Sequence, residues 1–301
     1  MSRGARHPLA RVRHVTPLGA RVATLGDHSC DPGELHRLVP YGRRMQLAVH
    51  ESGTGRRTAI LIHGIMSDSR AWHRVTAELE AKGFRVLAVD LSGHGRSPRA
   101  LRYSPAAWAD DVVETVAPML DGAPDVVMGH SLGGLVASLV ADRLAPRAAI
   151  YIDPAFAFPT GVKGWAYKTF FAIAPRPKRS ALVRMNPKWS AADVEIELAT
   201  LRDWDKRTIL GFADTRPLVP PARLVAPSLV LLAEKSLLIT DRVAAQMRRQ
   251  GMTVATVPGT GHTVFRDDHA GFMQAVMEWL RGVAPAPVGA TPAVAPARVN
   301  A

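Results

Sequence analysis

The chain has 301 residues, 47% of them hydrophobic and 21% charged, an ordinary globular composition that can bury a sizeable core. A single cysteine, Cys30, excludes an intrachain disulfide and makes a reducing compartment the default expectation. The basic N-terminus lacks the apolar stretch of a secretory signal, and no apolar run approaches the roughly 18 residues that span a bilayer. We therefore expect a soluble, cytoplasmic protein without a membrane span.

The formal net charge is +12, from 38 Lys and Arg against 26 Asp and Glu. A charge of this size could attract nucleic acid or anionic lipid. The first 26 residues, however, carry five arginines and no acid. The sequence also has no basic stripe interleaved with aromatics, and no zinc or helix-turn-helix signature. We attribute the charge to a basic tail and solvated arginines, and expect no nucleic-acid partner.

Short apolar stretches alternate with amphipathic ones through the middle of the chain. Three helices are predicted from apolar stripes: one around Trp72 to Leu79, one from Ser104 or Pro105 to Leu120, and a last one over 269–281. Another helix should follow Ser131. The apolar stretches predict strands at 46–51, 58–62, 85–89, 125–128, 148–152, 228–232 and 253–257.

This alternation predicts an α/β fold with right-handed crossovers and a mostly parallel sheet covered by helices on both faces. In such a sheet the ligand lies outside the carboxyl ends of the strands. The α/β core is predicted to comprise residues 41–154 and 227–283. Residues 1–40 are interpreted as a flexible basic extension, and the Pro- and Ala-rich residues 284–301 as a disordered tail.

The alternation breaks over residues 155–226, which we predict to form a helical cap over the strand ends. Ser190 to Asp193 resembles a capping box at the start of one of its helices. The segment also contains aromatic residues that either line a substrate pocket or simply hold the cap on its neighbours. These residues are Trp165, Tyr167, Phe170 and Phe171.

One short motif joins the 125–128 strand to the helix that follows it: Gly129-His130-Ser131-Leu132-Gly133. A G-x-S-x-G turn holds the serine backbone in a strained conformation and lifts its hydroxyl clear of both elements. The two glycines are needed because a side chain at either position would collide with the neighbouring strand or helix. We predict that Ser131 is a catalytic nucleophile. The alternative is a tight turn without chemistry.

A serine hydroxyl is a poor nucleophile and needs a base within hydrogen-bond reach. His262 lies in a Gly-rich loop between the last strand and the last helix, and follows the serine in the order that this type of turn uses. The tetrahedral oxyanion also needs fixed N–H donors. The backbone N–H groups of Leu132 and Ile65 are predicted to supply them. We interpret His63 and His130 as groups that order or pack the loops.

The chain carries four motifs in a fixed order: His63-Gly64, Asp90-Leu91-Ser92-Gly93-His94-Gly95-Arg96-Ser97, Gly129 to Gly134, and Gly261-His262. In this order they resemble the α/β-hydrolase fold family, in its serine esterase, lipase and haloperoxidase-like branch, over residues 41 to 283. The resemblance implies a mostly parallel eight-stranded sheet flanked by helices, with a helical cap inserted after strand 6.

One position departs from the family, which usually places its acid just after the seventh strand. The resemblance would put an aspartate at Ser236. Three interpretations stay open: Asp153 supplies the acid after the preceding strand, Glu234 reaches across, or the triad is weakened and Ser236 orients the base as a neutral group. We favour Asp153, although Asp153-Pro154 also fits a simple turn. Losing the acid can cost orders of magnitude in rate.

These residues predict a serine hydrolase that cleaves an ester, or secondarily a thioester or amide, of a small and largely apolar substrate. The acyl-enzyme would form on Ser131, with no cofactor and no metal. The alternative within catalysis is a C–C bond hydrolase or perhydrolase on the same triad. The alternative outside catalysis is a binding or regulatory protein with a weakened triad. No oligomeric state is predicted.

Overall fold

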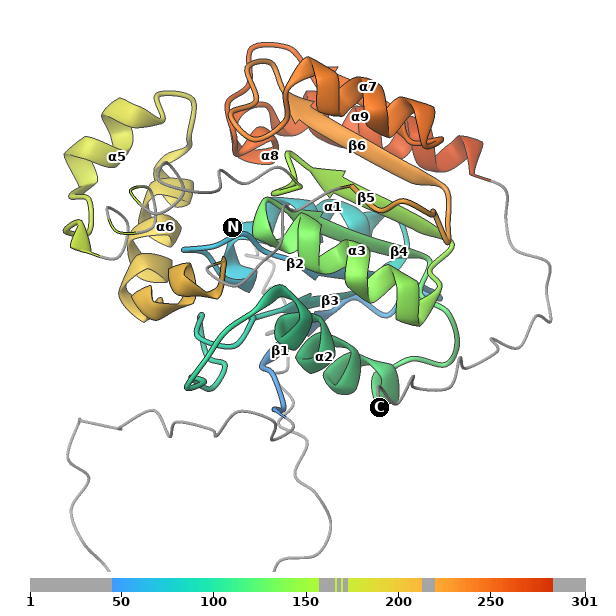
Figure 1. Ribbon diagram of the computed structural model, residues 1–301, viewed down its shortest axis with the longest axis horizontal. Helices are drawn as coiled ribbons and strands as arrows, with labels where there is room; N and C mark the ends of the chain where they lie inside the picture. Colours follow the sequence, from blue (N-terminus) through green and yellow to red (C-terminus); the bar gives the residue numbers. More distant parts are fainter. Residues whose placement is uncertain (1–44, 157–165, 167–168, 170–172, 213–219, 284–301) are drawn as a thin grey trace, which may run out of the picture.

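The computed structural model describes residues 45–156, 166, 169, 173–212 and 220–283. A seven-stranded sheet runs through these residues in the order β1-β3-β2-β4-β5-β6-β7 (Figure 1). The first strand pairs antiparallel with the third, and all other neighbours are parallel. The strands are β1 (Val49–Ser52), β2 (Arg57–Ile62), β3 (Phe84–Val89), β4 (Val126–His130), β5 (Ala148–Ile152), β6 (Ser228–Ala233) and β7 (Thr253–Val257).

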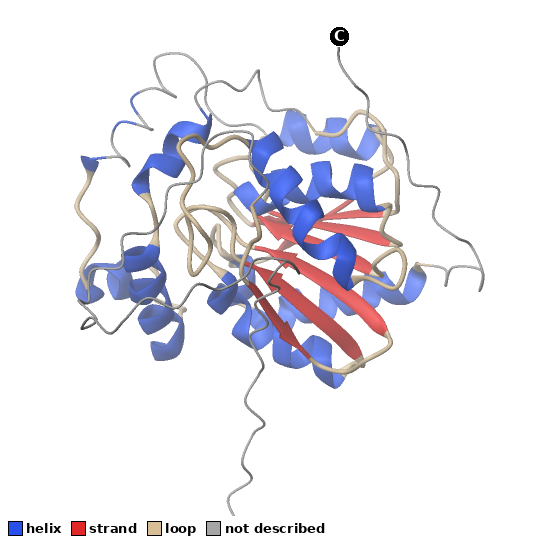
Figure 2. Cartoon of the chain, turned by 90° about the horizontal axis from the view of Figure 1, so that it is seen from below, coloured by secondary structure: helices blue, strands red, loops and turns tan. Residues whose placement is uncertain are grey.

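Helices cover both faces of the sheet (Figure 2). One face packs against α2 (Pro105–Val116), α3 (Leu132–Leu144) and α7 (Asp241–Arg249), and the other against α1 (His73–Ala81) and α9 (His269–Gly282). Successive residues of a strand point to opposite faces. On β2, for example, Ile60 and Ile62 therefore join the first core cluster while Ala59 and Leu61 join the second.

The strands and helices predicted from periodicity are present, but the first strand begins at Val49 and not at residue 46. The described residues contain seven strands, where the family resemblance implied eight. The segment directly before β1 is not a strand, because side chains take its backbone donors. The Leu47 N–H donates to Thr115 Oγ1 (3.0 Å) and the Ala48 N–H to Ser97 Oγ (2.8 Å). The sequence analysis also did not anticipate α7, whose apolar face is narrow.

The segment between β5 and β6 is helical where it is described, with α5 (Arg179–Met185), α6 (Ala191–Asp203) and the 3₁₀ helix η3 (Lys206–Phe212). It therefore follows the fifth strand of the described sheet, not the sixth. The predicted capping box is present: the Asp193 N–H donates to Ser190 Oγ, and the Ser190 N–H donates back to the Asp193 carboxylate.

The inserted segment has a small apolar cluster of its own, which packs on Ile65 and Met66 at the carboxyl end of β2. Its buried members are Leu182, Val194, Leu201 and Trp204. The four aromatic residues singled out in the sequence, Trp165, Tyr167, Phe170 and Phe171, lie outside the described residues. The predicted N-terminal extension, residues 1–40, and tail, residues 284–301, lie outside them too. No helix within the described ranges combines the length and apolar character that crossing a membrane requires.

Candidate active site

Ser131 stands between β4 and α3 with φ 53° and ψ −118°, in the left-handed region that non-glycine residues rarely adopt. Such a conformation costs on the order of 1–3 kcal/mol and persists only when the surroundings enforce it. Here the Ser131 N–H donates to the Ile152 carbonyl (2.9 Å), and the Ser131 carbonyl accepts from the Gly134 N–H (3.0 Å). Strand β5 and helix α3 thus hold the serine backbone in place.

Two glycines let the turn close. A Cβ atom on Gly129 would lie 2.0 Å from the Gly133 carbonyl oxygen, and one on Gly133 would lie 2.2 Å from the Ile62 carbonyl oxygen. Real Cβ atoms do not approach backbone that closely, so any larger residue would push β4, α3 and β2 apart. The prediction that both glycines are required by close approach is confirmed.

His262 and Asp153 meet at the same edge of the sheet. The Nδ1 atom of His262 lies 2.6 Å from Oδ2 of Asp153, whose side chain is completely buried. Because a carboxylate only accepts hydrogen bonds, Nδ1 carries the proton and Nε2 is left free to act as a base. Asp153 follows β5 with φ 38°, and its N–H donates to the Leu231 carbonyl (2.8 Å). A second strained residue therefore aims the carboxylate at the histidine.

The two other candidates for the acid position lie after β6 and face elsewhere. Ser236 Oγ accepts hydrogen bonds from the backbone N–H groups of Ile239 (2.9 Å) and Leu238 (3.3 Å). Glu234 is exposed to solvent, and its backbone N–H donates to the Thr260 carbonyl (3.1 Å). The structure thus brings Asp153 to His262 and uses Ser236 to close its own loop.

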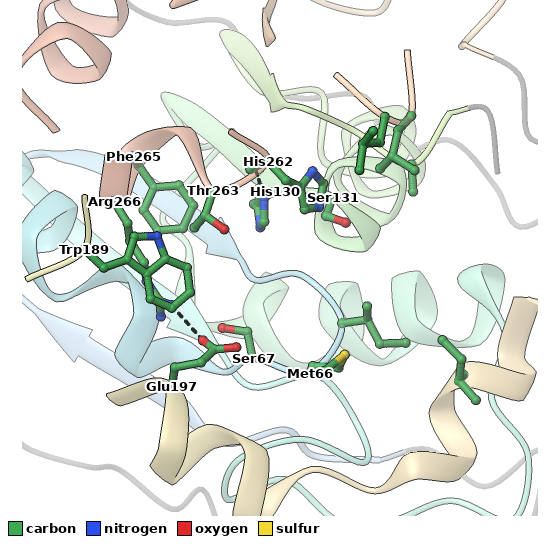
Figure 3. Close-up of a pocket in the computed structure, with 15 residues that line it drawn as sticks. Met66, Ser67, His130, Ser131, Trp189, Glu197, His262, Thr263, Phe265 and Arg266 are labelled. Atoms are coloured by element: carbon green, nitrogen blue, oxygen red, sulfur yellow. Dashed lines mark hydrogen bonds and ion pairs between the residues drawn. The ribbon is translucent and has the colours of Figure 1, made fainter. Parts of the chain in front are cut away.

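Ser131 and His262 line one cavity of about 260 Å³ (Figure 3). Ile65 also lines this cavity, and Leu132 is the first residue of α3, where backbone N–H groups have no acceptor within the helix. Most of the wall is apolar, formed by Ile65, Met66, Ala155, Ile209, Leu237, Leu238 and Phe265. Among the described residues, no group of three or more His, Cys, Asp and Glu side chains is placed to hold a metal ion.

His130 has a larger part in the site than its interpretation as a packing group suggested. Its Nε2–H donates to the backbone carbonyl of His262 (2.9 Å), and the two imidazole rings lie 4.7 Å apart. On its other side, Nδ1 faces Gly64, where a Cβ atom would approach to 2.9 Å. Burial, and secondarily the neighbouring His262, holds the pKa of His130 well below its usual value. A neutral histidine thus fills the space between the loop after β2 and the loop that carries His262.

His63 orders the glycine loop after β2, as the sequence predicted, and Asp90 orders the loop after β3. His63 donates from Nδ1 to the Gly64 carbonyl (2.7 Å), and its Nε2 accepts from the Leu91 N–H (2.9 Å). The Asp90 carboxylate accepts from the Ser69 N–H (2.7 Å) and the Arg96 N–H (2.9 Å).

Three further residues of the cavity carry no sequence motif: Trp189, Glu197 and Arg266. Arg266 follows His262 by four residues, and its side chain is buried against the inserted segment. Its Nη1 lies 2.7 Å from the Glu197 carboxylate. No sequence pattern pointed to these residues, because their partners lie about 70 residues away along the chain.

A parallel sheet that carries a strained serine after one strand and a histidine–carboxylate pair after two others defines the α/β class of hydrolases. The comparison of the sequence with family profiles agrees with this geometry. Residues 59–275 match the profile of the Alpha/beta hydrolase family, which is more than half of the chain. The chain belongs to the α/β-hydrolase family, and the resemblance drawn from the four motifs is confirmed.

Curated relatives match part of this domain. Lipase LipV of Mycobacterium tuberculosis is 39% identical over 112 residues, which cover 35% of this chain and 40% of the relative. Esterase PIR7B of Oryza sativa subsp. japonica is 32% identical over 115 residues, which cover 36% of this chain and 41% of the relative. The chain therefore spans about two fifths of the length of the curated relatives that it matches.

Solved structures match more of the chain. An esterase from Thermogutta terrifontis superposes with a TM-score of 0.64 at 25% identity, over 79% of this chain and 94% of that one. E-2-(Acetamidomethylene)succinate hydrolase superposes with a TM-score of 0.67 at 23% identity, over 79% of this chain and 96% of that one. At this level of identity the second match shows the shared fold alone.

Proposed function

We propose that the protein is a serine hydrolase that cleaves an ester of a small, largely apolar substrate through an acyl-enzyme on Ser131. The observation that carries the proposal is the 2.6 Å contact between His262 Nδ1 and Asp153 Oδ2. It gives the base a buried carboxylate partner although position 236 is a serine. Thioesters and amides are secondary substrates of the same chemistry.

In the proposed mechanism, His262 Nε2 takes the proton of the Ser131 hydroxyl as Ser131 Oγ attacks the acyl carbon. Asp153 stabilises the imidazolium that forms and holds the ring in the required tautomer. His262 then gives the proton to the leaving alcohol. Water repeats the sequence on the acyl-enzyme and releases the acid. Ser131 is regenerated, so no cofactor is consumed.

The backbone N–H groups of Leu132 and Ile65 are proposed to hold the oxyanion. Leu132 is at the N-terminus of α3, where the helix dipole also favours negative charge. Ile65 lines the cavity from the loop after β2. Because both contributions come from the backbone, the Ile65 side chain is free to shape the apolar wall around the substrate.

The proposed substrate class rests on the cavity wall and on the relatives. The wall is mostly aliphatic and aromatic, which suits an apolar acyl or alcohol part. Relatives are named lipase and esterase, which favours an ester over other acyl compounds. We further propose that residues 155–226 act as a cap, since α6 and its apolar cluster pack on the loop after β2.

The main argument for a binding protein with a weakened triad was the serine at 236. His262, however, has a carboxylate partner from another strand, so the serine at 236 does not by itself imply a weakened triad. No feature of the cavity specifically favours C–C bond hydrolysis or perhydrolase activity.

The experiment that tests the proposal is active-site labelling. A fluorophosphonate probe should label the wild-type protein rapidly and on Ser131, and the Ser131→Ala variant should not be labelled. Short p-nitrophenyl esters should be turned over by the wild type only. A protein that is neither labelled nor active, yet folded by circular dichroism, would disprove the proposed function.

A further inference from the structure

Among the described residues, the cavity lining contains one carboxylate. Glu197, on α6, lines the same cavity as Ser131, and its side chain is 15% exposed (Figure 3). Placing a carboxylate in a mostly apolar wall is costly unless it is paired. A charge kept in such a position calls for an explanation beyond packing.

A buried guanidinium fixes the orientation of this carboxylate. Arg266 donates from Nη1 to Glu197 Oε2 (2.7 Å), and the Trp189 ring lies 4.5 Å from the centre of the guanidinium. The Nε and Nη2 atoms of Arg266 are buried and donate no hydrogen bond within the described residues. The Glu197 side chain is 15% exposed and that of Arg266 only 2%, so a ligand in the cavity meets the carboxylate in preference to the guanidinium.

Negative charge exceeds positive charge around Arg266. Asp193 lies 3.7 Å from its Nε and also accepts a hydrogen bond from His73 (3.0 Å). Burial alone would raise the pKa of Asp193, but hydrogen bonds from His73 and Ser190 and the charge of Arg266 lower it to about 2. Two carboxylates, those of Asp193 and Glu197, thus lie against one guanidinium. The nearby Lys188 is exposed, and its Nζ donates to the Gly259 carbonyl (2.5 Å).

From this geometry, and resting on the proposed function, we infer that Glu197 is a specificity-determining residue. Its oxygen outside the Arg266 bond accepts a hydrogen bond from a hydroxyl or ammonium group at the end of the substrate remote from the scissile bond. The same oxygen repels a substrate that carries a carboxylate there. Ser67, drawn beside Glu197 in Figure 3, adds a second polar group at this end of the cavity.

The test compares matched esters that differ in one remote group. In the acyl series the p-nitrophenyl esters of hexanoate, 6-hydroxyhexanoate and adipate end in a methyl, a hydroxyl and a carboxylate group. In the alcohol series the monoacetates of hexanol, hexanediol and 6-hydroxyhexanoate end in the same three groups. In at least one series, kcat/KM for the carboxylate should be at least about tenfold below that for the hydroxyl compound, because like charges a few ångströms apart repel. Equal values in both series would overturn the inference while leaving the hydrolase intact.

Two variants of the same helix assign the effect. Glu197→Gln keeps an amide oxygen for Arg266 and removes the charge, so the gap between hydroxyl and carboxylate substrates should shrink to within about threefold. Glu195→Gln is the matched control, because Glu195 is an exposed residue that pairs with Arg179 (2.7 Å). It should leave the gap unchanged. A gap that persists in Glu197→Gln, or disappears in Glu195→Gln, would assign the selectivity to other residues.

A binding experiment decides the inference even if no ester is turned over. Hexylammonium should bind the Ser131→Ala protein in a calorimetric titration, and binding should weaken about tenfold on adding Glu197→Gln but not Glu195→Gln. Absent or equal binding in all three proteins would overturn the inference. If the wild-type protein is not labelled by the fluorophosphonate probe but hexylammonium binds and depends on Glu197 as expected, only the proposed function is disproved. Thermal unfolding checks that each variant is folded.

Discussion

The loops after β5 and β6 leave the same edge of the sheet from neighbouring parallel strands, yet they are built for different tasks. After β5, Asp153 is completely buried, adopts a positive φ and holds His262. After β6, Glu234 is exposed and Ser236 accepts hydrogen bonds from its own loop. The loop after β5 places a carboxylate against the proposed base, whereas the loop after β6 offers no side chain to it: Ser236 bonds its own loop, and Glu234 contacts the Thr260 carbonyl through its backbone N–H.

From this difference we propose that the acid of the site is defined by where strand ends meet and not by a fixed place in the sequence. The carboxyl ends of parallel strands converge, so a side chain after either strand starts close to the histidine loop. What distinguishes Asp153 is its burial and the backbone turn that aims it, since a carboxylate shielded from water stabilises an imidazolium more strongly.

The largest effect is expected from Asp153→Asn. An amide carries no charge to stabilise the imidazolium and can hold the ring in the wrong tautomer, so kcat should fall on the order of 10⁴-fold. Steady-state hydrolysis of p-nitrophenyl hexanoate measures the loss. The control is Glu234→Gln, which should stay within about twofold of wild type because Glu234 is exposed. A larger loss in Glu234→Gln than in Asp153→Asn would reverse the assignment of the acid.

A smaller effect is expected from moving the acid to the other strand. In the Asp153→Asn background, adding Ser236→Asp should regain about tenfold in kcat, because it places a carboxylate where the family resemblance expects one. Aspartate can also accept the loop N–H groups that Ser236 now binds. Adding Ser236→Asn instead gives the matched uncharged control. If both double variants are equally inactive, position 236 does not reach His262 in this chain.

The core of the fold was predictable because it depends on local periodicity. The apolar stretches before Asp90, Ser131 and Asp153 are short, continuous and bounded by turn residues, so their identity as buried strands follows from the sequence alone. The G-x-S-x-G turn was equally predictable, since a Cβ atom at either glycine would lie only 2.0 or 2.2 Å from a backbone carbonyl oxygen.

The acid and the polar end of the cavity were not predictable in the same way. Asp153 and Glu234 both follow buried strands, and only the three-dimensional reach of His262 separates them. The positive φ of Asp153 leaves no mark in the sequence, because Asp-Pro also begins ordinary turns. Glu197 and Arg266 lie on helices far apart in the chain, and their pairing depends on how the inserted segment packs.

An intermediate effect is expected at His130, which holds the histidine loop from the side of β4. His130→Phe removes the donor to the His262 carbonyl and should lower kcat about tenfold with little change in KM, since a displaced base loses alignment with the serine. His130→Gln keeps an N–H donor and should recover most of the activity. Equal loss in both variants would show that the hydrogen-bond donor alone does not account for the effect of His130.

A pH-dependent effect on stability is also expected from His130. Burial lowers its pKa in the folded state, so the unfolded chain binds more protons below about pH 6.5. The contribution of neutral His130 to the free energy of unfolding is therefore complete above pH 6.5. It is lost as the pH falls, by up to about 1.4 kcal/mol per pH unit. Urea unfolding at pH 7, 6 and 5 should show a shallower decline for His130→Gln than for wild type. Both proteins should still lose stability at low pH through His63 and His94, because burial lowers the pKa values of these residues too.

The smallest effect is expected from Ser236→Ala, which tests whether the loop after β6 has only a structural task. The hydroxyl accepts from the Ile239 and Leu238 N–H groups, so its removal should lower the free energy of unfolding by about 1 kcal/mol. Hydrolysis should be unchanged, because His262 is held by Asp153. Urea unfolding and kcat/KM measured on the same preparation separate an effect on stability from an effect on hydrolysis. A drop in kcat/KM beyond about threefold, with stability retained, would mean that Ser236 also orients His262 and that the two loops share the task.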